Sequence, residues 1–331
     1  MIIHVSNLHY NCGMQSPRTV IPYLALLFGI LTISFSGIFV HWSEAPGVVT
    51  SFYRLLIAIS LLAPLVLWRV RRAGLLRSAS LLRSATPLAG GPRPSKRVLI
   101  YPLLGGIFTA FDLGGWSTAL SYTSIANATL LNNIAPLWVA LFATLVWRER
   151  LRKGLWLGIA LTLTGAGVVL GSDMLRHPQL GLGDAIALGS SLFWAGYFLI
   201  TQRGRAFFDT LVYLLLMELG AAVSLLIFCL VTGQPMTGYP TSTWLAILAA
   251  ALGPQITGHF LIAYALGHLP ASVVSPTMIS QPVFTALLAV PLAGQALSPA
   301  QALGGIVVLL GIYLVNISRG QPQAVPAAVP S

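Results

Sequence analysis

Long runs of apolar residues, separated by short polar segments, alternate along the whole chain. A helix rises about 1.5 Å per residue, so about 20 apolar residues cross the hydrocarbon core of a bilayer, which is about 30 Å thick. Ten runs reach that length, at about residues 20–40, 46–68, 98–121, 124–147, 154–171, 183–202, 210–231, 244–267, 271–292 and 299–317. The pattern predicts an all-α integral membrane protein with ten transmembrane helices, and it excludes most classes of soluble protein.

The basic residues fall in alternate gaps between these runs. If the N-terminus is placed in the cytoplasm, sixteen of the 18 Lys and Arg lie on the cytoplasmic side, Arg176 lies outside, and Arg54 lies within a span. Segments that stay in the cytoplasm carry such an excess of basic residues. We therefore expect a multi-pass protein of the cytoplasmic (inner) membrane with both termini in the cytoplasm. The net charge of +11 comes from these cytoplasmic Lys and Arg, and it does not indicate a nucleic-acid partner.

The chain contains an internal repeat. Residues 136–169 align without a gap to residues 282–315, and ten of the 34 pairs are identical, including Pro136 with Pro282. Because each copy holds five spans, an odd number, the second copy must enter the membrane from the opposite side. Inverted repeats of this kind are common in secondary carriers, whose binding sites lie near the membrane midplane between the two halves.

The repeat sets the expected organisation of the chain as two inverted five-helix repeats in one domain. The segments are a cytoplasmic tail at 1–19, a first repeat at 20–171, a second repeat at 183–317 and a tail at 318–331. The first repeat carries a basic cytoplasmic loop at 69–97, and the last tail, rich in Pro and Ala, is expected to be disordered.

Several short motifs resemble those of EamA-type carriers of the drug/metabolite transporter superfamily, over about residues 20–317. They are Phe52-Tyr53-Arg54, Ala119-Leu120-Ser121-Tyr122-Thr123-Ser124, Ala126-Asn127-Ala128, Pro136 and Glu149-Arg150, with echoes at Ala265-Leu266 and Gln281-Pro282. The resemblance implies ten helices, cytoplasmic termini, peripheral fifth and tenth helices, and export or exchange of small metabolites. Gln295 departs from it, since the second copy usually carries a Glu that matches Glu149.

Four ionisable residues lie well inside the predicted spans: Arg54, Asp112, Glu218 and His259. A charge there costs about 2.5–3.5 kcal/mol on insertion scales unless it faces protein or water. Arg54 and Asp112 share one depth, and Glu218 and His259 share a depth on the other side, so we expect two acid/base pairs. The first pair either clamps two helices or holds a substrate carboxylate. Both members of the second pair can titrate, and proton coupling through that pair is our hypothesis.

Three other side chains complete the set of candidate substrate-binding or coupling residues. Trp116 lies one turn after Asp112 and serves either as the wall of a cavity or as an anchor at the membrane interface. Asn132 and Gln281 lie shortly before Pro136 and Pro282. Their amides could bond a carbonyl that the proline frees, contact a ligand, or join two helices.

The sequence holds no motif of an enzyme. It lacks a phosphate-binding Gly-x-x-x-x-Gly-Lys loop, and its two Cys have no metal-ligand spacing, so we expect no cofactor and no metal. We expect a secondary carrier that exports small polar metabolites such as amino acids by alternating access. The expected partners are the lipid bilayer, the metabolite and protons, with a homodimer left open. The alternatives are a passive channel, a non-transporting membrane scaffold and an intramembrane enzyme.

Overall fold

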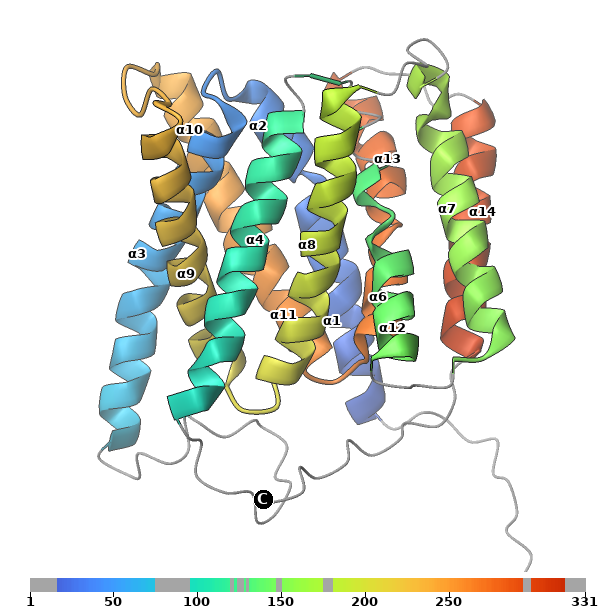
Figure 1. Cartoon of the computed structure of the whole chain (residues 1–331), viewed down its shortest axis with the longest axis horizontal. Helices are drawn as coiled ribbons and strands as arrows, with labels where there is room; N and C mark the ends of the chain where they lie inside the picture. The colour runs from blue at the N-terminus through green and yellow to red at the C-terminus, as the bar shows by residue number, and fades with distance from the viewer. Residues whose placement is uncertain are drawn as a thin grey trace, which may run out of the picture.

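The computed structural model describes residues 17–74, 96–119, 122–123, 128, 131–146, 151–174, 181–293 and 299–318, and within these ranges it contains helices and no strands. Figure 1 shows the helices standing side by side, roughly parallel or antiparallel to one another. The part of the chain that can be described is therefore an all-helical bundle. The expected tail before residue 17, the middle of the basic loop and the tail after residue 318 lie outside the described residues.

The helices follow the apolar runs closely. They are α1 (Pro17–Ser34), α2 (Ser36–Trp42), α3 (Gly47–Gly74), η1 (Lys96–Leu99), α4 (Ile100–Ala119), α6 (Ala135–Leu145), α7 (Lys153–Met174), α8 (Leu182–Gly204), α9 (Thr210–Val231), α10 (Thr241–Ala250), η2 (Ala251–Gly258), α11 (His259–Leu266), α12 (Ala271–Met278), α13 (Gln281–Ala293) and α14 (Pro299–Ile317).

Six segments among the described residues are long and apolar enough to cross a membrane. They are Val20–Val40, Gly47–Arg69, Arg97–Ala119, Leu182–Gly204, Thr210–Val231 and Thr241–Leu266. Shorter apolar helices cover Ala135–Leu145, Lys153–Val168 and Ala302–Ile317. The expected spans at 124–147 and 271–292 do not form single long helices in the described residues, because the first is only partly described and the second is broken into α12 and α13.

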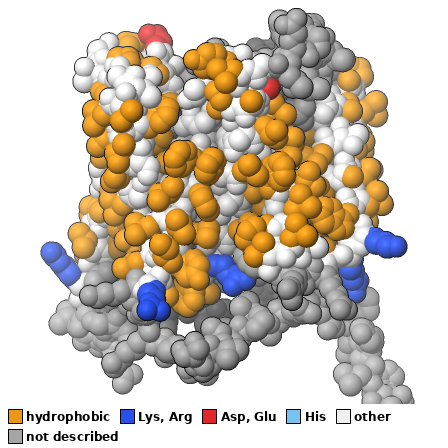
Figure 2. Space-filling model, in the orientation of Figure 1, with side chains coloured by type: hydrophobic (Ala, Val, Ile, Leu, Met, Phe, Trp, Pro, Cys, Tyr) orange, Lys and Arg blue, Asp and Glu red, His pale blue; other side chains and the backbone are white. Residues whose placement is uncertain are grey.

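On the visible surface, charged side chains lie at the two ends of the bundle. In Figure 2 apolar side chains cover the middle of the visible face, Lys and Arg lie along its lower edge, and Asp or Glu lies at its upper edge. An apolar band between two charged rims is the surface that a bilayer requires. The protein is therefore a multi-pass membrane protein.

Several helices are interrupted. α1 ends at Ser34 and α2 begins at Ser36, so the first apolar segment bends at Phe35. α6 begins just before Pro136, and α13 begins just before Pro282, at positions that the sequence repeat pairs. Proline lacks an N–H group and disrupts the preceding turn, which explains both of these starts.

α7 and α14 form a separate pair at one edge of the bundle (Figure 1). Their backbones approach closely at two places: a Cβ on Gly158 would lie 2.8 Å from Gly311 O, and a Cβ on Gly165 would lie 2.7 Å from Gly304 O. The lower-numbered residue of α7 meets the higher-numbered residue of α14, so the two helices are antiparallel. Glycine permits this approach because it has no side chain.

Candidate functional site

A cluster of buried polar and charged side chains lies inside the bundle. It includes Arg54 on α3, Asp112 on α4, Glu218 on α9, Gln255 on η2 and His259 on α11, and none of the five is more than 5% exposed. Charged groups in the middle of a membrane are costly and are usually functional. This cluster is therefore the candidate substrate site.

Arg54 is the centre of the cluster. Its Nη1 donates a hydrogen bond of 3.1 Å to Ser36 Oγ, at the start of α2. Its guanidinium interacts electrostatically with Asp112 and Glu218, and also with the imidazole of His259. Arg54 forms no ion pair with either carboxylate. The guanidinium of Arg54 and the carboxylates of Asp112 and Glu218 thus interact without forming a direct ion pair.

Asp112 is held by side chains from two other segments. Its Oδ1 accepts hydrogen bonds of 2.8 Å from Asn132 Nδ2 and of 2.8 Å from Ser190 Oγ on α8. Asn132 Nδ2 also donates to Ser190 Oγ at 2.9 Å, which closes a three-membered network. The network fixes the carboxylate in place, because hydrogen bonds to a charged group are stronger than those between neutral groups.

Glu218 is held by one amide. Gln255 Nε2 donates a hydrogen bond of 3.1 Å to Glu218 Oε1. Gln255 lies in η2, a π-helical segment of eight residues that contains Pro254 and joins α10 to α11. π-Helical turns often occur at functional sites because the extra residue per turn redirects the side chains. Here the segment places Gln255 and His259 on the inner side of the bundle, where both are buried.

Two aromatic rings of α8 pack against one side of His259. The imidazole packs edge-on against Tyr197 at 6.0 Å and against Trp194 at 6.4 Å, measured between ring centroids. Trp194 and Tyr197 stack on each other at 4.9 Å with an interplanar angle of 7°. This aromatic wall closes one side of the cluster.

Five buried polar atoms of this region have no hydrogen-bond partner in the protein. They are Arg54 Nε, Tyr197 Oη, Glu218 Oε2, Gln255 Oε1 and His259 Nδ1. Leaving such an atom unpaired costs about 1–3 kcal/mol, so native proteins keep few of them. Several together in one connected cluster indicate a place where water or a polar ligand completes the hydrogen bonds.

The two acid/base pairs expected from the sequence are not formed. Glu218 is bonded to Gln255, and its second oxygen has no partner, so it does not pair with His259. Arg54 interacts with the charges of both expected pairs and makes its hydrogen bond to Ser36. Arg54 and Asp112 interact electrostatically, as expected, but neither pair is in direct contact, because depth along a helix does not fix which way a side chain points. The structure joins the four residues into one cluster.

The structure places the other three candidate residues in different surroundings. Asn132 belongs to it through Asp112 and Ser190. Gln281 begins α13, and its carbonyl accepts a 3.3 Å hydrogen bond from Ser34 Oγ, next to the break between α1 and α2. Trp116 packs against the small residues Ala119, Ala128 and Ala187.

Sequence reasoning missed four residues of the site: Ser36, Ser190, Tyr197 and Gln255. Gln255 is the one that a sequence signal could have revealed, because it is an amide in an apolar run, next to Pro254 and one turn before His259. Serine and tyrosine are common in apolar helices, so nothing marked the other three.

Deeply buried charged groups in a bundle of apolar helices are typical of membrane transporters. The chain matches the EamA-like transporter family over residues 20–171 and 181–317. It belongs to this family, and so to the drug/metabolite transporter superfamily.

Relatives agree with this assignment. An uncharacterized transporter of Archaeoglobus fulgidus is 26% identical over 302 residues, which cover 90% of this chain and 97% of that protein. The threonine/homoserine exporter RhtA of Escherichia coli K12 is 30% identical over 281 residues, covering 74% of this chain and 88% of RhtA. A solved crystal structure of a protein with 22% sequence identity superposes with a TM-score of 0.68, covers 89% of this chain and 96% of that one, and shows the likeness in fold.

Proposed function

We propose that the protein is a secondary active transporter that exports small polar metabolites such as amino acids, and that the cluster around Arg54 binds them. The observation that carries this proposal is the arrangement of charges: Arg54 is buried and interacts electrostatically with Asp112 and Glu218, and it forms an ion pair with neither. A guanidinium binds a carboxylate through parallel hydrogen bonds, and a carboxylate binds an ammonium group. A zwitterion would satisfy both kinds of group at once.

The comparisons support the substrate class. RhtA is named as an exporter of threonine and homoserine, two small amino acids with a hydroxyl group. In the present chain, Gln255 Oε1 and Tyr197 Oη are buried and unpaired beside the charged groups. They are suited to bind a polar side chain of the substrate.

We propose further that the transporter contains ten spans in two inverted repeats and works by alternating access. Two features support this. Helix starts recur before Pro136 and Pro282, which the repeat pairs. The repeat pairs Gly158 with Gly304 and Gly165 with Gly311. If each residue of the contact between Gly158 and Gly311 is replaced by its repeat partner, the result is the second observed contact, between Gly304 and Gly165. That is the relation expected of a pseudo-two-fold axis between the halves.

The proposed orientation places both termini in the cytoplasm. The lower edge in Figure 2, where Lys and Arg collect, is then the cytoplasmic side. The inner membrane is the proposed location. Substrate would enter the cluster from the basic side and leave at the opposite end.

Protons are the proposed coupling ion. Glu218 is fully buried, and only one of its carboxylate oxygens has a partner. A carboxyl group in that position can hold a proton in one state of the cycle and release it when Arg54 approaches. This role rests on Glu218 with Gln255, not on a pair with His259.

The test is counterflow in proteoliposomes. Vesicles that contain the purified protein are loaded with unlabelled threonine, homoserine or another small amino acid, and uptake of the labelled compound is followed. A carrier shows transient accumulation and saturation. A passive channel shows neither, and a scaffold or an enzyme shows no uptake. If a folded protein gives no counterflow with any small amino acid, the proposed substrate class is wrong.

A further inference from the structure

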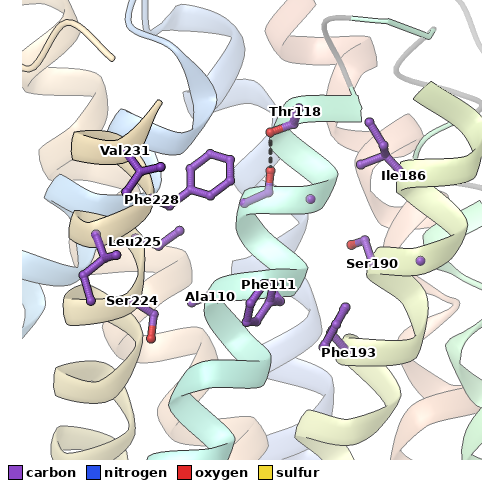
Figure 3. A pocket seen from close by; sticks show the side chains of 14 residues that line it. Ala110, Phe111, Thr118, Ile186, Ser190, Phe193, Ser224, Leu225, Phe228 and Val231 are labelled. Carbon is purple, nitrogen blue, oxygen red and sulfur yellow. Dashed lines mark hydrogen bonds between the residues drawn. The ribbon is translucent and has the colours of Figure 1, made fainter. Parts of the chain in front are cut away.

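A cavity lies beside the charged cluster, between α4, α8 and α9 (Figure 3). Its volume is about 520 Å³, within the usual range of about 300–1,000 Å³ for ligand sites. The side chains that line it are mostly large and apolar: Phe111, Ile186, Phe193, Leu225, Phe228 and Val231. Several of them, including Phe111 and Val231, are also exposed on the bilayer-facing surface.

The few polar groups of the wall are already satisfied. Thr118 Oγ1 donates to Gly114 O at 2.7 Å, and Ser224 Oγ donates to Gly220 O at 2.8 Å. Ser190 Oγ is bonded to Asp112. The lining therefore offers no free hydrogen-bonding hydroxyl, so it suits a hydrocarbon occupant and not a polar metabolite.

The cavity extends through one half of the membrane. On α4 it runs over nine residues, from Ala110 to Thr118, whose ends lie about 12 Å apart along the helix. One leaflet of a hydrocarbon core about 30 Å thick is about 15 Å deep. The cavity lies toward the end of α4 that is remote from Arg97 and therefore in the outer leaflet of the proposed orientation.

Below the cavity, α4 and α9 close together. A Cβ on Gly105 would lie 2.7 Å from Tyr213 Oη, and a Cβ on Gly106 would lie 2.8 Å from Ala221 N. Such contact leaves no space between the helices in the other half. A transmembrane helix of a second copy, which is about 10–12 Å wide and crosses both leaflets, does not fit a space that ends at the midplane.

We propose that this cavity binds one acyl chain of an outer-leaflet phospholipid. The chain would enter between α4 and α9 and pack against the phenylalanine rings, with its head group near Thr118. The back wall includes Ser190, whose hydroxyl holds the Asp112 carboxylate, so an occupied cavity would also steady Asp112. That second step rests on the proposed function, whereas binding of the lipid rests only on the proposed orientation.

Photolabelling tests the binding. The protein is reconstituted with a phospholipid that carries a diazirine on its acyl chain, irradiated and mapped by peptide mass spectrometry. We expect adducts concentrated on the cavity-facing parts of α4, α8 and α9. Gly189→Phe should reduce these adducts severalfold, because Gly189 lines the cavity and a Cβ there meets no atom within 4 Å.

Gly167→Phe is the matched control. Gly167 lies on α7, away from the cavity, and a Cβ there also meets no atom within 4 Å. This variant should label at these sites like the wild type. Ser224→Phe also fills the cavity, from α9, and replaces Gly189→Phe in the test if that variant does not fold.

Two outcomes overturn the proposal. One is a pattern in which all bilayer-facing helices are labelled equally and in which neither Gly189→Phe nor Ser224→Phe changes the labelling. The other is an adduct between two copies of the protein through this face, which would identify a dimer contact. Both readouts are independent of transport, so a failure of the amino-acid proposal leaves this test intact.

Discussion

The guanidinium of Arg54 donates a hydrogen bond to Ser36 Oγ at the junction where α1 ends and α2 begins. The charge at the centre of the site is thereby attached to an interruption in a helix. A substrate carboxylate that binds Arg54 would compete with Ser36 for its N–H groups. Binding could then shift α2 relative to α1, since a ligand favours whichever conformation it contacts better.

Replacement of Arg54 by lysine should reduce counterflow at least about tenfold, because a hydrogen bond to a charged group contributes about 1.5–3 kcal/mol. Lysine keeps the charge and loses the planar fork that binds a carboxylate. Counterflow with Arg54→Lys is the measurement. Arg69→Lys is the control, since Arg69 is exposed on the same helix, α3. If Arg54→Lys and Arg69→Lys have equal activity, Arg54 does not bind the substrate.

Ser190→Ala should weaken substrate binding more than it weakens the fold. The variant removes one donor to Asp112 and leaves Asn132 in place, so we expect a free energy of unfolding lower by about 1–2 kcal/mol. The apparent KM for counterflow should rise. Ser60→Ala is the control, because Ser60 is exposed and bonds only the carbonyl of Leu56 on its own helix. An unchanged KM with reduced stability would make the Asp112 network purely structural.

Gly311→Val should destabilise the protein, because a Cβ at this position would lie 2.7 Å from Thr162 N and 2.8 Å from Gly158 O on α7. Overpacking of this kind costs about 1–3 kcal/mol, and here the obstacle is backbone that cannot turn away. Thermal unfolding in detergent measures the effect. Gly167→Val on the same helix pair meets open space and should leave the unfolding temperature unchanged. A tolerated Gly311→Val would show that α7 and α14 are not in close contact.

Arg205→Gln should also lower stability, although the sequence marks Arg205 only as one of the cytoplasmic charges. The residue is buried; its Nε donates to Ala263 O at 3.0 Å and its Nη1 donates to Phe208 O. It thus ties the turn after α8 to α11. Loss of these charged hydrogen bonds should cost about 2–3 kcal/mol, measured by thermal unfolding. Arg69→Gln serves as the exposed control, and equal stability of the two variants would contradict this role.

The sequence was sufficient to predict an all-helical membrane protein and the six long spans of the described residues, because the length of an apolar run is set by the thickness of the bilayer. It was also sufficient to identify Arg54, Asp112, Glu218 and His259 as unusual, because charge in an apolar run is rare. It did not predict their partners. Gln255, which bonds Glu218, lies in the π-helical segment η2, and a π-helical turn leaves no mark in an apolar pattern.

The breaks within the helices were harder to predict than the helices themselves. Pro136 and Pro282 lie at the starts of α6 and α13, whereas the expected spans at 124–147 and 271–292 ran through both prolines without a break. The bend at Phe35 has no proline or glycine at that position. It is accompanied by tertiary contacts of the neighbouring serines, with Arg54 bonding Ser36 and Ser34 bonding the Gln281 carbonyl. Contacts between distant segments of this kind cannot be read from local sequence.

Glu218→Gln should abolish any dependence of transport on a pH gradient while leaving exchange of substrate across the membrane in place. The amide keeps the shape and the contact with Gln255, but it cannot take up or release a proton. Uptake into proteoliposomes is measured with and without an imposed gradient, and counterflow at equal pH reports exchange. His259→Gln is the comparison, because His259 makes aromatic contacts and does not pair with Glu218. A gradient response that survives in Glu218→Gln and disappears in His259→Gln would transfer the coupling role to the histidine. A response that survives in both would place the coupling elsewhere in the cluster, with Asp112 as the next carboxylate to replace.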